Sequence, residues 1–335
     1  MAAIENRYEI LALVNAENCN PNGDPNMNNM PRVDWTTGKG IITDVSIKAR
    51  QRAYVASAFD GRSGYQILVR NGESLNKRIA EVVFEANGVS SFSKDEKNTK
   101  VDASAAIMCE RYWDVRTFGG VLSTGLNAGQ VRGAVQIGMA SSVDDVEACN
   151  MSITRMCFTE GKYPTLDEYD DAAAKMDDDK KRTFGDKNYI PYGLYVVKMT
   201  VSANLAQKVG FSEDDLKVLL ESTMQMYDAS ASSSKMGMSV LSPVIVFKHV
   251  GTQADTNSEQ GARERLLGCA PAYKLFDLLT IKRKDGVAVP RKYQDYNMDL
   301  HLSKLPAGVV CGIKKLPFSD VEWLPPMGDV DLMTL

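Results

Sequence analysis

The sequence has few of the residues on which metal binding and nucleophilic catalysis usually depend. Its 335 residues include only two histidines, His249 and His301, and six cysteines without a CxxC pair. A structural zinc site needs clustered Cys and His ligands, and a catalytic dyad needs a histidine beside its nucleophile. The composition therefore argues against both kinds of site. We expect the cysteines to be unpaired and mostly buried.

Long apolar runs and an excess of positive charge are also absent. No run approaches the ~18 residues of a membrane-spanning helix, and residues 1–9 lack the pattern of a secretory signal. We therefore expect a cytoplasmic protein. Lys and Arg total 39 against 43 Asp and Glu, a formal net charge of -4. This balance excludes a wholly basic nucleic-acid coat but allows a local basic face, because phosphate binding depends on clustered charge.

The remaining composition is that of a folded globular chain. Hydrophobic residues make up 44% and charged residues 24%, close to the average for soluble domains. At ~150 residues per domain, the length fits two domains or one elaborated domain.

Apolar runs and their periodicity predict an ordered series of elements. We expect strands or helices, in the order βαββαβ, at residues 7–17, 43–58, 65–70, 190–202, 213–227 and 240–247. This order predicts an α+β fold of the ferredoxin-like or RNA-recognition-motif (RRM) type with large insertions. Within the insertions, residues 75–86 and 102–113 have helical spacing, and residues 164–182 form a charged segment that we expect to be exposed to solvent.

The sequence does not match several common enzyme signatures. The Gly38–Lys39 pair lacks the first glycine and the hydroxyl residue of a phosphate-binding P-loop. No dinucleotide fingerprint, GxSxG elbow or HExxH motif is present. Residues 116–123 match the RNP1 string of RRM proteins only in part, because Gly120 and Ser123 replace the last two stacking aromatics.

Three basic clusters, each associated with glycines or small residues, are better candidates. The first is Lys48, Arg50 and Arg52 on the first helix, where Lys48 and Arg52 share a face and Arg50 points elsewhere. The second is the segment 129–133, which contains Gln130 and Arg132, with Arg116 upstream; the third is the loop 230–239 with Lys235. Arginine, lysine and backbone N–H groups all bind phosphate. Together the clusters suggest the path of a nucleic-acid backbone.

Acidic residues of the first loop support a competing hypothesis. Asp24, Asp34 and Asp44 could hold Mg²⁺ for phosphodiester cleavage. We favour a structural interpretation, in which Asp24 stabilises an Asn-Gly-Asp-Pro turn and Asp44 caps the following helix.

A set of short motifs, in a fixed order along residues 5–280, resembles the backbone subunit of type I-C CRISPR surveillance complexes (Cascade), a family of crRNA-binding RAMP proteins. The motifs are NPNGDP (20–25), MPRVD (30–34), TDVSIK (43–48), DVRTFG (114–119), GQVRG (129–133), SITR (152–155), IPYGLY (190–195) and KLFDL (274–278). Two departures are Ala134, where the family usually has proline, and a less arginine-rich loop at 230–239.

The resemblance implies a hand-shaped single domain spanning residues 1–335. Its palm would be a modified RRM fold from about residues 5–17, 43–72 and 188–250. Fingers would lie at about 18–42 and 73–150, a thumb-like hairpin within 155–190, and a C-terminal extension at 281–335. Copies would form a helical filament along the CRISPR RNA (crRNA) and present its spacer to target DNA, beside the crRNA-processing subunit, the large subunit and a small subunit in some complexes. A separate enzyme cuts the target, so the resemblance implies a scaffold that is not an enzyme and needs no cofactor or metal.

A protein that accepts any spacer should contact phosphate and ribose rather than base edges. The resemblance assigns RNA contacts to Lys48, Arg52, Arg116, Gln130, Arg132 and Lys235. Asn20 and Asn22 would shape the first loop, and Met156 and Phe158 would form the apolar wedge of the thumb.

Two alternatives stay open. Related subunits of type III complexes cleave RNA with an aspartate in the loop after the first strand, which makes Asp24 or Asp34 the candidate in a metal-dependent endoribonuclease. The flanking motifs favour the type I interpretation. The other alternative is a metabolic enzyme of ferredoxin-like fold.

Overall fold

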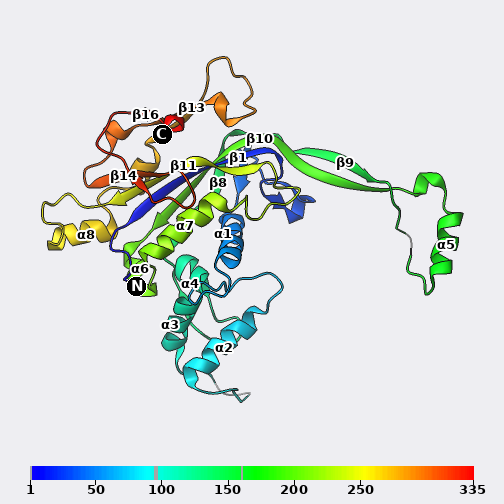
Figure 1. Ribbon diagram of the computed structural model, residues 1–335, viewed down its shortest axis with the longest axis horizontal. Coiled ribbons are helices and arrows are strands. Elements are labelled where there is room, and N and C mark those ends of the chain that lie inside the picture. The colour runs from blue at the N-terminus through cyan, green and yellow to red at the C-terminus, as the bar shows by residue number, and fades with distance from the viewer. Residues whose placement is uncertain (1, 94–96, 160) are drawn as a thin grey trace.

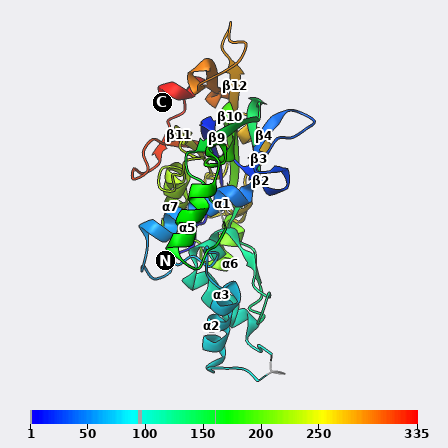
Figure 2. The ribbon, with the colours of Figure 1, turned by 90° about the vertical axis from the view of Figure 1, so that its right-hand side faces the viewer.

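The computed structural model describes residues 2–93, 97–159 and 161–335. Figure 1 shows a central sheet with helices beneath it, a helical lobe further below, a C-terminal unit above and a long arm to one side. Figure 2 places the lobe and the C-terminal unit at opposite ends of the molecule. The fold is mixed α/β and is built on one large antiparallel sheet.

The sheet is organised around β1 (Tyr8–Cys19), whose apolar run is almost fully buried because both faces of the sheet are covered. β1 pairs with β10 (Thr183–Val201) on one side and with β11 (Met238–His249) on the other. The order across the sheet is β15-β14-β11-β1-β10-β8-β4. The other strands in this order are β4 (Lys39–Ile42), β8 (Ala140–Asp145), β14 (Val309–Lys314) and β15 (Glu322–Trp323).

The strand expected at residues 65–70 does not form. Its only β-bridge within the described part of the chain joins Gln66 to Tyr112. The Asp114 carboxylate accepts the backbone N–H of Leu68 at 2.8 Å and that of the next residue at 3.1 Å. A side chain therefore satisfies donors that a neighbouring strand would otherwise bind. The place beside β10 is taken by β8, and β4 lies beyond it.

Helices α1 (Asp44–Ala58) and α7 (Glu213–Gln225) cover one face of the sheet (Figure 1). Thr43, and not Asp44, is the N-cap of α1. α7 begins with a capping box between Ser212 and Asp215, which satisfies two free N–H groups of its first turn. The main core lies between these helices and the sheet and includes Ile10, Val14, Ile47, Val55, Tyr195, Leu219 and Val246.

The C-terminal extension is an integral part of the fold. β14 pairs with β11 and so widens the central sheet. β12 (Leu279–Arg283), β13 (Tyr296–Leu300) and β16 (Val330–Asp331) form a small sheet of their own. A second core between this unit and the upper face of the central sheet includes Leu11, Leu13, Ile245, Phe247, Leu275, Met298, Leu300 and Leu332.

The helical lobe is inserted between α1 and β8. It contains α2 (Leu75–Asn87), α3 (Val101–Arg111) and α4 (Trp113–Phe118), and it has its own small core. The helix expected at 102–113 thus ends at Arg111, and Tyr112 separates α3 from α4 in an extended conformation.

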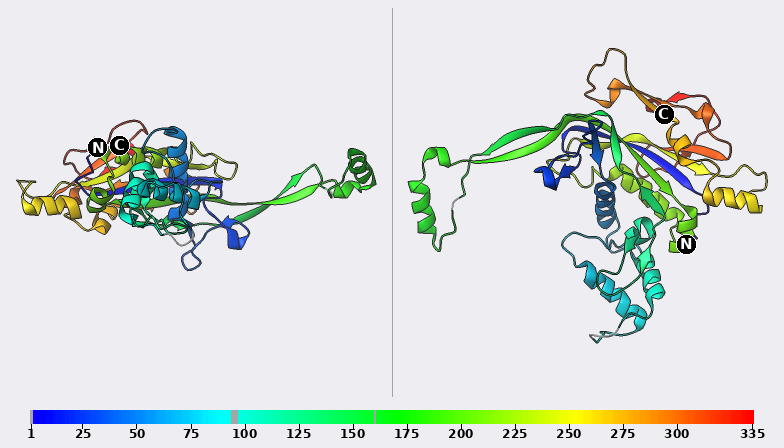
Figure 3. Two further views of the ribbon diagram at one scale, coloured as in Figure 1. Left: turned by 90° about the horizontal axis from the view of Figure 1, so that it is seen from below. Right: turned by 180° about the vertical axis from the view of Figure 1, so that it is seen from behind.

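The arm is a two-stranded ribbon that projects from the sheet, as both views of Figure 3 show. β9 (Cys149–Arg155) pairs with the first seven residues of β10. α5 (Leu166–Lys175) lies at the far end. The ribbon occupies the region expected for a thumb but begins at Cys149, before residue 155.

The remaining elements are short. They are β2 (Gly23–Asp24), η1 (Pro25–Met27), β3 (Met30–Pro31), β5 (Gly120–Val121), β6 (Gln130–Val131), β7 (Val135–Ile137), η2 (Asp178–Lys180), α6 (Ala203–Val209), α8 (Glu259–Leu267), α9 (Ala272–Phe276), η3 (Tyr293–Asp295), η4 (Leu302–Lys304) and η5 (Leu332–Thr334).

Candidate nucleic-acid interface

Two of the three predicted basic clusters meet where β1 ends, at the base of the arm. The Asn20 N–H donates to the Ser234 carbonyl at 2.9 Å, and the Lys235 ammonium donates to the Asn20 carbonyl at 2.6 Å. From α1, Arg50 Nη1 donates to the Ser230 carbonyl at 2.9 Å. The first loop, α1 and the loop 230–239 therefore form one connected surface.

Asn20 and Asn22 organise the backbone of the first loop. Asn20 is almost fully buried, and its Nδ2 donates to the Asn29 carbonyl at 2.7 Å. Asn22 Oδ1 accepts from both the N–H and the hydroxyl of Thr43, at 2.9 and 2.8 Å. Asn22 thereby ties the loop to the residue that caps α1, so the loop and the helix share one rigid junction.

Lys48 and Arg52 lie next to each other over the edge of α4. Lys48 Nζ is 5.9 Å from the centroid of the Phe118 ring, and the Arg52 guanidinium carbon is 5.2 Å from it. Each cation also has a carboxylate partner: Asp44 at 2.9 Å for Lys48, and Asp114 at 2.8 Å for Arg52. The side chains are 17% and 15% exposed, respectively, so both cations are held in place but still reach the surface.

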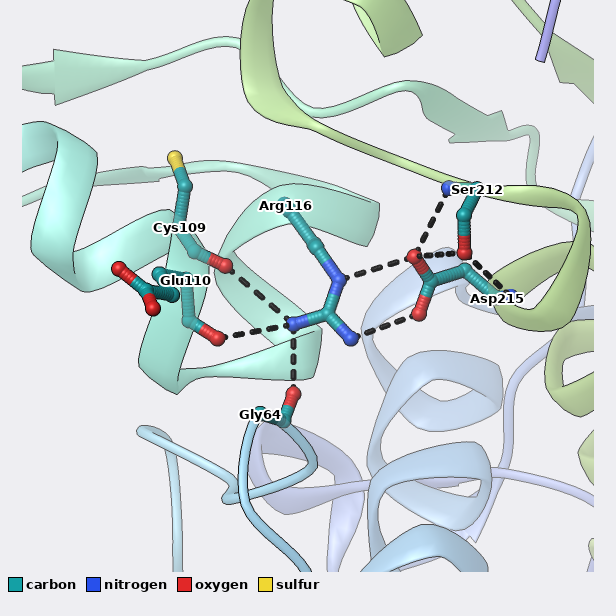
Figure 4. A network of polar contacts seen from close by, with 6 residues as sticks. All are labelled: Gly64, Cys109, Glu110, Arg116, Ser212 and Asp215. Carbon is teal, nitrogen blue, oxygen red and sulfur yellow. Dashed lines mark hydrogen bonds and ion pairs between the residues drawn. The ribbon is translucent and has the colours of Figure 1, made fainter. Parts of the chain in front are cut away.

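Arg116 does not lie on this surface, which corrects its assignment as an RNA contact. The residue is buried, and its guanidinium binds both carboxylate oxygens of Asp215, at 3.0 and 2.6 Å. Its Nη1 donates to the carbonyls of Gly64 at 2.6 Å and Cys109 at 3.2 Å (Figure 4). These contacts engage Nε and both Nη groups, so Arg116 joins the helical lobe to α7.

Gln130 and Arg132 are exposed, as expected of ligand contacts. They line a cleft between the helical lobe and α6, together with Lys208 and the buried Arg116. The residues that line this cleft include none from α1 or from the loop 230–239. The second cluster thus lines a cleft that is separate from the surface formed by the other two clusters.

The segment 130–133, which carries Gln130 and Arg132, packs closely against the backbone of α4. A Cβ atom on Gly133 would lie 2.3 Å from the Gly119 nitrogen and 2.4 Å from the Thr117 carbonyl oxygen. Gly119 itself has a φ of +77°, a region that favours glycine. The glycines therefore serve the packing of α4 against the segment 130–133.

Lys235 is largely buried between the two loops. Burial, with a further contribution from the Arg50 charge, lowers the pKa of the Lys235 ammonium to about 8. Its donors are directed at the carbonyls of Asn20 and Pro21. Lys235 therefore holds the first loop in place. The neighbouring Arg50, which the helical spacing placed away from the cluster, donates to both the carbonyl and the hydroxyl of Ser230.

The acidic residues of the first loop have structural partners. Asp24 accepts from the Asn26 N–H at 3.0 Å and pairs with Arg32 at 3.1 Å. Asp34 accepts from the Thr36 N–H at 3.0 Å and from the Thr37 hydroxyl at 2.7 Å, and these hydrogen bonds lower the pKa of its carboxyl group. Within residues 2–93, 97–159 and 161–335, no group of three His, Cys, Asp or Glu side chains is placed to hold a metal ion.

The two faces of the arm ribbon differ in chemistry. Residues directly opposite in an antiparallel pair share a face, and the register pairs Met151 with Lys187 and Ile153 with Gly185. One face therefore carries two exposed apolar side chains, about half exposed at 49% and 50%, beside the cation of Lys187. Phe184, 74% exposed, lies on the other face, opposite Thr154.

The predicted wedge residues lie beyond the paired part of this ribbon. Met156 is 70% exposed, and Phe158 is half-buried. Met151 and Ile153 begin the stretch 151–158, whose weak alternation predicts a strand, and they lie in the paired part of the ribbon, on the face that also carries Lys187.

None of the helices among the described residues has both the length and the apolar character needed to cross a membrane.

Comparison with known proteins agrees with the motif order. The family model described as CRISPR-associated protein Cas7 matches residues 6–301. The chain is 34% identical over 118 residues to a CRISPR-associated protein Cas7 of Haloferax volcanii, which is 35% of this chain and 33% of that protein. The match therefore spans about a third of the length of this curated relative.

Solved structures provide more distant likenesses. A chain of a pre-nicking CRISPR RNA-guided surveillance complex has a TM-score of 0.45 and 13% identity, and covers 72% of this chain and 78% of its own. A chain of another CRISPR RNA-guided surveillance complex has a TM-score of 0.40 and 12% identity, over 72% of this chain and 68% of its own. The family match, in contrast, runs from the start of β1 to the end of β13, and on that ground the chain belongs to the CRISPR-associated protein Cas7 family.

Proposed function

We propose that this chain is the crRNA-binding backbone subunit of a type I-C CRISPR surveillance complex. In this role it is a non-catalytic scaffold in the cytoplasm: copies line up along the guide RNA and present its spacer for pairing with target DNA. The observation that carries the proposal is the match of residues 6–301 to the Cas7 family. The partners would be crRNA, target DNA, further copies of the chain, the crRNA-processing subunit, the large subunit and, in some complexes, a small subunit.

We also propose that the palm is a modified RRM fold. The order β11-β1-β10-β8 supports this proposal, with α1 after β1 and α7 between β10 and β11. With β8 as the second strand, the chain follows βαββαβ. The helical lobe then lies between α1 and the second strand, and the arm between the second and third strands.

Three cations and one amide side chain that reach the surface define a revised set of RNA contacts. We assign Lys48 and Arg52 on α1, and Gln130 and Arg132 at the lobe, to phosphate and ribose. Their exposure and their distribution over two elements support contacts along a backbone rather than to one base. Arg116 and Lys235, with Asn20 and Asn22, would act as positioning residues that hold the loops from which contact is made.

Lys48→Ala with Arg132→Ala tests this assignment. The double variant should bind guide RNA more weakly, by a similar factor for unrelated spacers, and its salt slope should fall by ~1 per lost phosphate contact. The matched control is Arg263→Ala with Lys304→Ala, which removes two exposed cations from α8 and η4. A loss that depends strongly on the spacer sequence would contradict backbone contact.

The same binding assay examines the endoribonuclease alternative. With Mg²⁺ present, we expect the bound RNA to stay intact. Mg²⁺-dependent cleavage that disappears in Asp24→Ala or Asp34→Ala would replace the scaffold proposal by the nuclease one.

A further inference from the structure

We propose that the tip of the arm, which carries α5, docks on the loop 282–292 of a second copy of this chain. The proposal rests on the assembly role suggested above and names the surfaces that join neighbouring copies. It concerns two segments that the RNA-binding surface leaves unexplained: the charged segment 164–182 and the C-terminal extension.

Within the part of the chain that the structure describes, no other element buries the helix at the arm tip. α5 has ten residues and none of them is buried, and Leu166 at its start is 80% exposed. A helix this short is marginal in water without tertiary packing. Its support within the chain is the Thr165 cap and an edge-to-face contact between Tyr163 and Tyr169, with ring centroids 5.0 Å apart.

The tip contains a groove that combines apolar surface with charged groups, among which carboxylates outnumber lysines. The groove has a volume of about 550 Å³ and lies between α5 and the segment that follows it. Its lining combines apolar surface with three carboxylates and two ammonium groups: Tyr163, Ala172 and Met176, then Glu168, Asp171 and Asp177, then Lys175 and Lys180. Lys180 pairs with Asp177 at 2.9 Å, so Glu168 and Asp171 are the carboxylates of the lining without an ion pair to a described residue. Residues 164–182 include seven acidic and four basic side chains. This net negative charge disfavours a nucleic-acid phosphate as the occupant and favours a basic, partly apolar segment.

The loop 282–292 has the complementary character. It contains five basic residues and one acidic residue around the apolar stretch GVAVP, in which Val289 is 67% exposed. Lys284 and Arg291, one on each side of that stretch, are exposed and form no ion pair with any residue that the structure describes. An apolar projection flanked by cations thus complements an apolar groove in a tip segment of net negative charge.

The loop is held in a defined position. Arg283 Nη2 lies 2.9 Å from Asp144 Oδ1, and its Nη1 donates to the Ala288 carbonyl at 2.7 Å. Arg283 thus anchors the loop to β8, while Lys284 and Arg291 stay exposed. Figure 2 shows this loop projecting from the end of the molecule opposite the helical lobe.

The positions of the two surfaces predict a head-to-tail contact. Pro191 and Tyr192 of β10, at the base of the arm, line a hollow together with Arg283 and Arg291. The loop therefore sits at the base of the ribbon, and α5 sits at its far end. The paired ribbon spans seven register positions, ~20 Å at the usual strand rise. Because the two surfaces differ, each copy can bind the next, and the contact continues as an open filament.

A charge exchange tests the contact. Lys284→Glu with Arg291→Glu should weaken the binding of successive copies to an RNA long enough for several of them, about tenfold. The binding of one copy to a short RNA should stay unchanged. Asp171→Lys with Asp177→Lys should have the same effect, and the fourfold variant, which restores opposite charges at the contact, should recover cooperative binding. Lys217→Glu with Lys304→Glu is the matched control.

The other possible results show whether the contact between copies or the proposed scaffold function is wrong. Unchanged cooperativity in both double variants would overturn the contact while RNA binding stands. Weaker binding of short RNA by the loop variant, without recovery in the fourfold variant, would assign the loop to nucleic acid and also overturn the contact. Failure of the unmodified protein to bind short RNA would instead contradict the scaffold function itself.

Discussion

At the scale of single residues, the contacts of Arg116 explain why a sequence motif can indicate the wrong role. The DVRTFG motif places Arg116 three residues before Gly119, in a glycine-rich segment typical of ligand-binding loops. Its partner Asp215, 99 positions away, is at the start of α7. Local sequence contains no sign of that pairing. Arg132, which has no ion pair with a described residue, resembles Arg116 in sequence context but is exposed.

Arg116→Ala should therefore reduce stability rather than remove an RNA contact. Deleting one member of a buried ion pair leaves the other charge unpaired and costs about 3–5 kcal/mol. The measurement is the free energy of unfolding in denaturant, with Arg132→Ala as a matched arginine control that should stay within about 0.5 kcal/mol of the unmodified protein. Full stability of Arg116→Ala together with weaker RNA binding would restore the original assignment.

Lys235 predicts a pH dependence of stability. Its pKa of about 8 in the folded protein lies below the ordinary lysine value of 10.5, so between these values the unfolded chain binds more protons. The contribution of this group to stability should be constant below about pH 8 and should rise with pH up to about 10.5. The difference in unfolding free energy between the unmodified protein and Lys235→Met isolates this effect. A difference that is flat over that window would contradict the buried ammonium.

At the scale of elements, the long apolar strands and capped helices were predictable, because burial leaves a strong pattern. β1, β10, β11, α1 and α7 fall close to their expected ranges. β4 and β8 were not predicted, because they are short and alternate weakly. The C-terminal strands were missed for the same reason. Their apolar residues form a second core only once they meet the upper face of β1, and this pairing has no local signal.

The residues of the candidate site also fall into two groups, those whose exposure the sequence predicts and those whose role depends on distant contacts. Gln130 and Arg132 are exposed and Lys48 reaches the surface in part, as helix and loop patterns indicate, and their RNA contacts stay predictions. Whether a charge is free depends on distant partners, so the structural roles of Arg116, Lys235 and Arg50 could not be predicted from the sequence.

Gly133→Ala tests the junction between α4 and the segment 130–133. The new Cβ would meet backbone atoms at 2.3–2.4 Å, and overpacking of this kind costs about 1–3 kcal/mol. Gly120→Ala is the control, because its Cβ would meet only the Leu122 side chain at an ordinary 3.5 Å. Equal thermal unfolding of the two variants would show that the junction yields more easily than the backbone contacts imply.

The arm ribbon gives a prediction about its two faces. Met151→Ser with Ile153→Ser should reduce guide-dependent assembly, whereas Phe184→Ser on the opposite face should reduce it less. All three side chains are about half exposed or more, so unfolding free energies should change little, within about 0.5 kcal/mol. Assembly size on RNA can be measured by analytical ultracentrifugation. A larger effect of Phe184→Ser would reverse the assignment of the faces.

At the scale of the whole molecule, four parts radiate from one sheet: the helical lobe, the first loop, the arm and the C-terminal unit (Figure 1). The family resemblance expected from the motif order is confirmed by the match to residues 6–301. The subtype, the lack of catalysis and the assembly are proposals, and the experiments described here test them.

The most direct test is co-expression of the protein with a CRISPR repeat-spacer array and the neighbouring CRISPR-associated genes, followed by purification and a denaturing gel of the bound nucleic acid. The scaffold function predicts one discrete guide-length RNA in a large assembly that contains several copies of the protein. Protein that elutes at monomer size and free of RNA would contradict it.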